Sequence, residues 1–145
     1  MSGMRPAAGH ARLALALALS LLAAACREHL RLEDTSGAGG PLTPSMWGGD
    51  QAGLVVSDTG ATLTFACAVG TIAGSIQLDA AGHFSVSGIY AFTPGPAYLP
   101  HPATYEGTVG GDRMTMSVIA PEVSPDPLGP FALVRGVPFS GPVCL

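Results

Sequence analysis

Three cysteines, Cys26, Cys67 and Cys144, are the residues whose chemistry the sequence constrains most closely. In an exported protein, an odd number of cysteines leaves one without a disulfide partner. If Cys26 is used in another way, Cys67 and Cys144 can pair and close a loop of about 75 residues, which contributes roughly 4–5 kcal/mol in the chain-entropy model. A zinc site is disfavoured, because two cysteines so far apart, with no histidine near them in the sequence, lack the usual ligand spacing.

The segment before Cys26 indicates what that other use is. Arg5 and Arg12 form a basic start, residues 13–22 are an apolar run of Leu and Ala with one Ser, and three alanines precede Cys26. This order is typical of an export signal peptide over residues 1–25, and the apolar run is about half the roughly 20 residues of a membrane-spanning helix. Small residues followed by cysteine resemble the bacterial lipoprotein signal, in which the cysteine becomes the lipidated first residue. We expect a cell-envelope lipoprotein anchored in the membrane through Cys26; the alternative is ordinary cleavage at Ala-x-Ala, which gives a secreted or periplasmic soluble protein.

A second motif with chemical meaning is Asp58-Thr59-Gly60, which follows two valines and a serine. It resembles the active-site pattern of aspartic proteases, which need two carboxylates sharing a proton, so a single-lobed enzyme would have to dimerise. The same three residues form a good turn between two alternating strands, because Asp caps the backbone and Gly accepts a positive φ. Neither a downstream Gly-bearing apolar segment nor a flap hairpin is identifiable, so we expect the turn and no enzyme activity.

The remaining candidates for catalysis or metal binding are isolated. His83 follows a turn and His101 precedes a proline, so each is expected in solvent rather than on a metal. Met114 and Met116 share one strand face, which suits a core better than a redox site. No serine lies in a Gly-x-Ser-x-Gly elbow, and we expect no catalytic residue, metal or cofactor.

The charge composition limits the classes of binding partner that we expect. Beyond residue 25 the chain holds four arginines, no lysine and ten carboxylates. Nucleic acid is therefore not an expected partner, because its binding needs a basic surface. Residues 26–45 are polar and then rich in Gly, Ser and Pro, which predicts a flexible tether, and the approximately 100 residues from 46 to 145 are enough for one folded domain.

That domain reads almost wholly as alternating strands. Apolar residues recur with a period of two in seven segments, and residues 139–144 are a candidate for an eighth strand. Representative positions are Leu54, Leu63, Ile72, Phe84, Tyr105, Met116 and Leu133. Gly-bearing turns at 58–60, 79–82 and 110–112 predict hairpins, whereas the connections 93–103 and 121–130 are long and Pro-rich.

The pattern predicts an all-β fold in which a small antiparallel meander closes into a seven- or eight-stranded β-barrel, with a β-sandwich as the alternative. Tight turns would seal one end and the two Pro-rich loops would rim the other. We expect Trp47 to plug one end and Tyr98 to lie in a rim loop. The side chains expected to line a ligand site or to make rim contacts are Phe84, Tyr90, Tyr98, Tyr105, Met114 and Met116.

Several spaced residues carry a resemblance to other proteins. They are Trp47-Gly48-Gly49, Phe65-x-Cys67-Ala68-x-Gly70-x-Ile72, Leu78-Asp79-x-x-Gly82-x-Phe84-x-Val86-x-Gly88-x-Tyr90, Tyr105-x-Gly107 and Cys144-Leu145. From about Trp47 onward the chain resembles a group of small uncharacterised bacterial envelope proteins. The resemblance implies a small β domain with a Cys67–Cys144 bridge and carries no activity. The expected architecture is also similar to lipocalin- and avidin-like binding barrels and to periplasmic barrel inhibitors of proteases or lysozymes.

Two functions follow as hypotheses. The first is a non-enzymatic binding module that takes a small apolar ligand into the barrel, although a barrel this small can be filled by its own side chains. The second is a protein-interaction role, as an inhibitor or assembly factor that engages an envelope protein through the Pro-rich loops.

Overall fold

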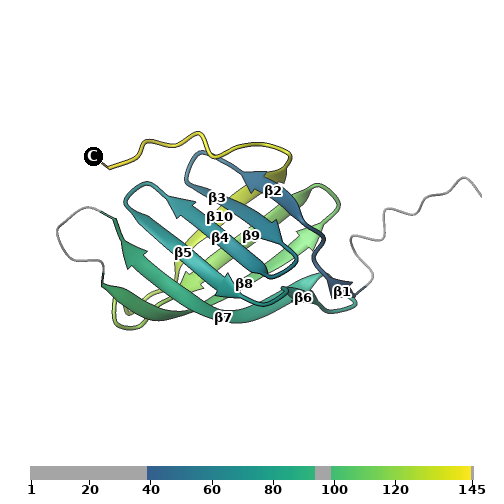
Figure 1. Ribbon diagram of the computed structural model, residues 1–145, viewed down its shortest axis with the longest axis horizontal. Helices are drawn as coiled ribbons and strands as arrows, with labels where there is room; N and C mark the ends of the chain where they lie inside the picture. Colours follow the sequence, from purple (N-terminus) through teal and green to yellow (C-terminus); the bar gives the residue numbers. More distant parts are fainter. Residues whose placement is uncertain (1–38, 94–98, 145) are drawn as a thin grey trace, which may run out of the picture. The chain divides into compact units, whose positions relative to one another are not determined.

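The computed structural model describes residues 39–93 and 99–144, and every regular element in these ranges is a strand (Figure 1). No helix in this part of the chain is long and apolar enough to cross a membrane. The strands are β1 (Gly40–Pro41), β2 (Ser45–Gly48), β3 (Ala52–Ser57), β4 (Gly60–Phe65), β5 (Ala68–Ala73), β6 (Gln77–Leu78), β7 (His83–Phe92), β8 (Pro100–Gly110), β9 (Arg113–Ile119) and β10 (Leu128–Arg135).

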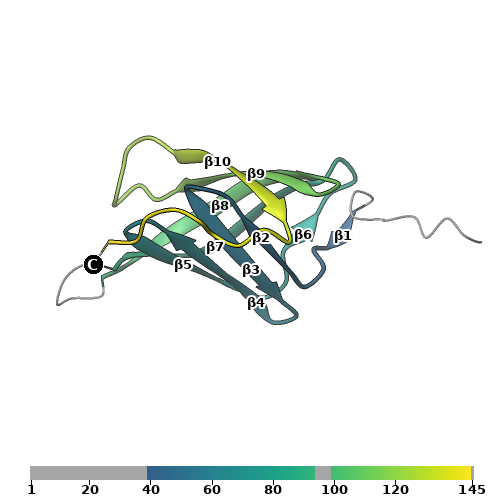
Figure 2. The same cartoon turned by 90° about the horizontal axis from the view of Figure 1, so that it is seen from above.

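Eight of these strands form a closed antiparallel barrel in the order β10-β2-β3-β4-β5-β7-β8-β9 (Figures 1 and 2). The predicted meander and its closure are confirmed, and the sandwich alternative is not the fold. Closure depends on a short seam, because β10 and β2 share only the partner pairs Val134↔Gly48 and Arg135↔Trp47. At the seam the Arg135 guanidinium lies over the Trp47 ring, 4.8 Å from its centroid, which is within cation–π range.

The eighth strand is not where the sequence pattern placed it. It is β2, on the N-terminal side, whereas residues 139–144 form no strand. In this segment Phe139 packs onto the outside of the barrel against Gly53, whereas Val143 is exposed. The rim loops are also shorter than predicted, since β8 already begins at Pro100 and β10 at Leu128.

Part of the predicted tether is folded. Gly40 and Pro41 form β1, which pairs with β6 in a small two-stranded sheet. Leu42 donates its amide to Ile76 and is buried in the core beside Ile76 and Leu78. One apolar residue between prolines gives no periodic signal, so composition alone assigned this segment to the tether.

The two ends of the barrel differ as the turn pattern predicts. The turns at 58–59, 79–82 and 111–112 connect β3 to β4, β6 to β7 and β8 to β9 at one end, called here the turn end. At the opposite end, called here the rim end, β7 ends, β8 begins, and residues 120–127 connect β9 to β10. The Cys67–Cys144 disulfide also lies at the rim end, in the β4–β5 connection.

The interior is filled by side chains, and Tyr105 is at its centre. Tyr105 is 0% exposed, and its hydroxyl donates to the Ile89 carbonyl at 2.6 Å. Its ring needs glycines opposite it: a Cβ on Gly70 would collide with the hydroxyl, and one on Gly88 would approach the ring to 2.8 Å. Ile89 pairs with Thr71 on β5 and with Pro102 on β8, and Pro102 has no amide hydrogen to donate.

We predict that Tyr105→Phe lowers the free energy of unfolding by about 1–2 kcal/mol, because it removes a buried hydrogen bond and leaves the carbonyl less satisfied. Urea denaturation measures the change. An unchanged midpoint would show that the bond contributes nothing net.

Gly70→Ala tests the fit of the same ring. We expect a loss of about 1–3 kcal/mol from overpacking, and a smaller loss when the same change is made in the Tyr105→Phe background. Urea denaturation of the four proteins forms the double-mutant cycle. Strict additivity would contradict direct contact between the two positions.

Candidate functional site

The side chains predicted to line an internal ligand site are part of the core. Phe84, Tyr90, Tyr105, Met114 and Met116 are all buried, and they belong to one continuous hydrophobic cluster. An empty cavity of ligand size would leave its lining accessible to a water-sized probe, yet Tyr105 is 0% and Met116 is 1% exposed. Tyr98 and the lipidation residue Cys26 lie outside the described residues.

Tyr90 belongs to an aromatic group at the rim end of this core. Its ring centroid lies 5.5 Å from Phe65 and 5.6 Å from Phe92, and Phe65 in turn lies 5.2 Å from Phe131. These are tilted and edge-on contacts, which aromatic pairs prefer. Burial raises the pKa of the Tyr90 hydroxyl, so this phenol stays neutral at physiological pH.

An open space of ligand size lies on the outside of the barrel. A groove of about 820 Å³ runs between β6 and the outer face of strands β7, β8 and β9; we call it the outer groove. It is lined by Gln77, Leu78, Asp79, His83, Phe84, Ser85, Glu106, Gly107, Thr108, Thr115 and Ser117. Phe84 alone was among the predicted site residues, and it is nearly fully buried. Most of the lining side chains carry a polar group, but apolar atoms make up the larger share of the exposed lining surface.

Strand alternation places these polar groups together. Ser85 on β7 pairs with Glu106 on β8, and Glu106 pairs with Ser117 on β9, which makes one row across the outer face. His83 and Thr108 begin a second row in the same way, and Thr115 continues it. Because successive residues of a strand point to opposite faces, the apolar residues between them point into the core.

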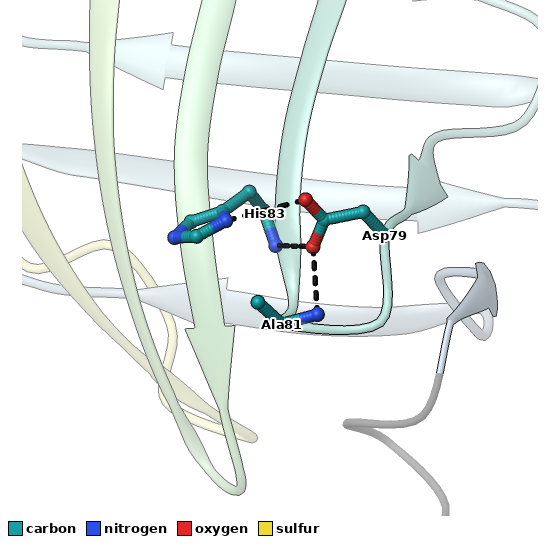
Figure 3. Close-up of polar contacts among 3 residues, drawn as sticks. All are labelled: Asp79, Ala81 and His83. Carbon is teal, nitrogen blue, oxygen red and sulfur yellow. Dashed lines mark hydrogen bonds and ion pairs between the residues drawn. The ribbon is translucent and has the colours of Figure 1, made fainter.

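Asp79 and His83 form the end of the groove nearest the turn end (Figure 3). The Asp79 Oδ1 accepts hydrogen bonds from the amides of Ala81 and His83, each at 2.8 Å, and Oδ2 lies 3.3 Å from His83 Nδ1. The backbone hydrogen bond from His83 is the largest cause that lowers the pKa of Asp79, with smaller contributions from the Ala81 amide and the His83 ring opposed by partial desolvation. Asp79 therefore closes the turn and keeps a negative charge in the groove.

The rest of the groove is rich in hydrogen-bond acceptors. Ser85 Oγ donates to Glu106 Oε1 at 3.2 Å, and Asp79 and Glu106 supply two carboxylates. No arginine or lysine is among the lining residues. In the described ranges no group of three His, Cys, Asp or Glu residues could hold a metal ion.

The other sequence candidates lie elsewhere. Asp58 and Thr59 are exposed in the two-residue turn between β3 and β4, where Ser57 Oγ donates to the Gly60 carbonyl. His101 is not isolated: its Nδ1 lies 3.0 Å from Glu122 Oε2, which joins β8 to the segment that precedes β10. The Cys67–Cys144 disulfide, expected from the count of cysteines, is present.

Sequence reasoning did not identify the outer groove. Ser85, Glu106 and Ser117 occupy the polar positions of three strands, and this parity was readable from the alternation. The register between the strands, which aligns these three residues in one row, could not be predicted from the sequence. The sequence also did not show that β6, which contains Gln77, and the bend after it, which begins at Asp79, lie at the edge of this row.

We predict that Asp79→Asn lowers the melting temperature at pH 7, because Asn keeps the acceptor oxygen but loses the charge. Since the folded pKa of Asp79 lies below its ordinary value of 3.8, its contribution is present above that pH and is lost as pH falls through the folded pKa. The difference in melting temperature between wild type and Asp79→Asn should therefore shrink below about pH 4. Calorimetry at pH 7 and pH 3 measures it, and a difference that grows in acid would contradict the assignment.

Comparison of the chain with protein families, with curated proteins and with solved structures finds no match. The resemblance to small envelope proteins stays a prediction.

Proposed function

We propose that this protein is a non-catalytic binding module of the cell envelope, anchored through lipidated Cys26, that holds a small ligand in the outer groove. The observation that carries the proposal is the contrast between a filled barrel and an open groove of about 820 Å³ on its outer face. The groove lies within the range of volumes typical of small-molecule sites. A ligand inside the barrel would have to displace Tyr105 and its neighbours.

The lining argues for a ligand that carries polar groups as well as apolar surface, in place of the purely apolar one expected from the sequence. Two carboxylates, four hydroxyls, one amide and one imidazole line the groove. A ligand hydroxyl can donate to a carboxylate and accept from a serine or threonine, so a neutral, hydroxyl-bearing molecule matches this set. An anionic ligand is disfavoured, because Asp79 and Glu106 repel it and no basic side chain compensates.

The absence of catalysis is part of the proposal. Of the two groove carboxylates, Asp79 is held by two backbone amides, and Glu106 accepts from Ser85. These bonds suit fixed acceptors that orient a ligand better than groups that exchange protons during a reaction.

We predict that Thr115→Arg abolishes ligand binding, because a long cationic side chain on the outer face of β9 fills the groove. Thr71→Arg is the matched control, since Thr71 is an exposed outward-facing threonine of β5 outside the groove. Native mass spectrometry of protein recovered gently from its own host's envelope weighs the acyl group, the disulfide and any bound molecule together. Bound mass retained by Thr71→Arg and lost by Thr115→Arg supports the proposal; equal retention places the ligand elsewhere, and no bound mass in wild type contradicts it.

A second candidate, binding of an envelope protein, is favoured by exposed apolar residues at the rim end. Phe92, Leu99 and Val143 are 43%, 61% and 59% exposed, and we call them the rim surface. They lie near one another: Leu99 precedes Pro100, which pairs with Ala91, and Val143 precedes the cysteine bonded to Cys67. Clustered apolar exposure of this kind is typical of protein contact sites.

Phe92→Ser tests this second role. We expect it to lose an envelope protein that crosslinks to the wild type, because it removes the one aromatic side chain of the rim surface. Val55→Ser is the control, since Val55 is similarly exposed on β3, away from that surface. Equal crosslinking by both variants would remove the rim surface as the contact site.

A further inference from the structure

The chain after β10 crosses the barrel instead of leaving it. Residues 136–144, which we call the strap, run along the outside of β2 and β3 toward the β4–β5 connection (Figure 2). Gly136 donates to the Met46 carbonyl at 2.7 Å, Ser140 to Gly49 at 3.1 Å, and Cys144 to Ala66 at 2.7 Å. The Cys67–Cys144 disulfide fixes the far end.

The surface beneath the strap is shaped to receive it. A Cβ on Gly48 would collide with the backbone of Val137 and Pro138, and a Cβ on Gly53 would lie 2.8 Å from the Cβ of Phe139. Both glycines face outward, opposite the inward-facing Trp47 and Leu54. Glycine at these positions lets the strap backbone lie directly on the sheet.

Between its two ends the strap is weakly held. There the Val137 amide donates to Val134 at 3.3 Å, and Ser140 donates to the Gly49 carbonyl through its amide at 3.1 Å and its hydroxyl at 3.4 Å. Pro138 and Pro142 have no amide to donate. Phe139 is half-buried, while Pro138, Ser140, Pro142 and Val143 are exposed. Segments with few buried contacts and few backbone hydrogen bonds open at low free-energy cost.

The barrel is complete without the strap. None of its described residues belongs to the buried core, and all eight barrel strands pair without its help. A disulfide acts mainly on the unfolded chain, so its loss lowers total stability without removing a native barrel contact. Cys144 is exposed and Cys67 is partly exposed, which gives a reductant access to the bond.

We propose that the Cys67–Cys144 disulfide is a redox latch that holds residues 136–144 over Gly48 and Gly53, and that reduction by a dithiol releases the strap while the barrel stays folded. A thiolate of the dithiol attacks one sulfur of the bond, which breaks the Cys67–Cys144 bond, forms a mixed disulfide with one cysteine and releases the other as a thiolate. The second thiol of the reductant, as thiolate, then attacks the reductant sulfur of the mixed disulfide and releases the remaining cysteine as a thiolate. The reductant leaves as a disulfide, and its two protons end on Cys67 and Cys144. The product exposes the outer face of β2 and β3 beside the β10–β2 seam.

Amide hydrogen exchange tests the latch. The exchange is followed by NMR on the intact exported protein, with and without dithiothreitol, and is read at amides of the barrel domain. Iodoacetamide labelling of both cysteines verifies that reduction is complete. We expect the protection of the Ser140 and Cys144 amides to fall by about tenfold or more, and that of the Tyr105 and Val118 amides to change by less than about twofold. Unchanged protection at Ser140 and Cys144 would overturn the latch. Loss of protection at Tyr105, or aggregation on reduction, would show that the barrel does not stay folded when the strap is released.

Two sets of variants test the latch further. The Cys67→Ser/Cys144→Ser protein should show the released pattern at Ser140 at once, with no response to dithiothreitol. Gly53→Ala should loosen the strap with the disulfide intact, because the added methyl group pushes against Phe139. Gly110→Ala is the matched control, since its Cβ would meet open space, and it should leave Ser140 protected. A strap that stays protected in both the double-serine and the Gly53→Ala proteins contradicts the proposal.

Discussion

Closure of the ring between β10 and β2 is the constraint on which the rest of this structure depends. An open eight-stranded sheet would leave two unpaired edges, and closure removes both. The seam achieves this with two partner pairs, Val134↔Gly48 and Arg135↔Trp47, supported by the Arg135 guanidinium over the Trp47 ring. Once the ring is closed, every strand of the barrel has one face in the core and one face on the outer surface.

The size of the ring decides which of these two faces can bind. A barrel of eight strands has an interior just wide enough for side chains or for one small ligand, depending on what fills it. Here Tyr105 lies against Gly70 and Gly88, and Phe84 lies against Gly107. Glycines that would otherwise leave space are matched to large rings opposite them. The interior therefore stabilises the fold. Two features lie on the outer surface of the barrel instead: the groove on β7, β8 and β9, and the face under the strap.

Much of the fold could be predicted because alternation and turn chemistry are local. Phe84, Tyr105 and Met116 lie inside as their parity indicates, and Asp58-Thr59 forms the expected hairpin turn. Leu42 and the eighth strand could not be predicted, because short segments between prolines and glycines carry no period. For the site, the polar parity of Glu106 and its neighbours was visible, but their alignment required the register between strands.

The sequence by itself determined an all-β chain of alternating strands, the end at which the long loops lie, and a pairing of Cys67 with Cys144. These follow from side-chain period, turn residues and the number of cysteines, each readable within a few positions or from a simple count. Only the tertiary structure decided that the interior is full, that the outer faces of β7, β8 and β9 form a groove with Asp79, and that residues 136–144 lie across Gly48 and Gly53. The physical reason is that packing, register and close backbone approach depend on residues far apart in the chain, which meet only after the ring has closed.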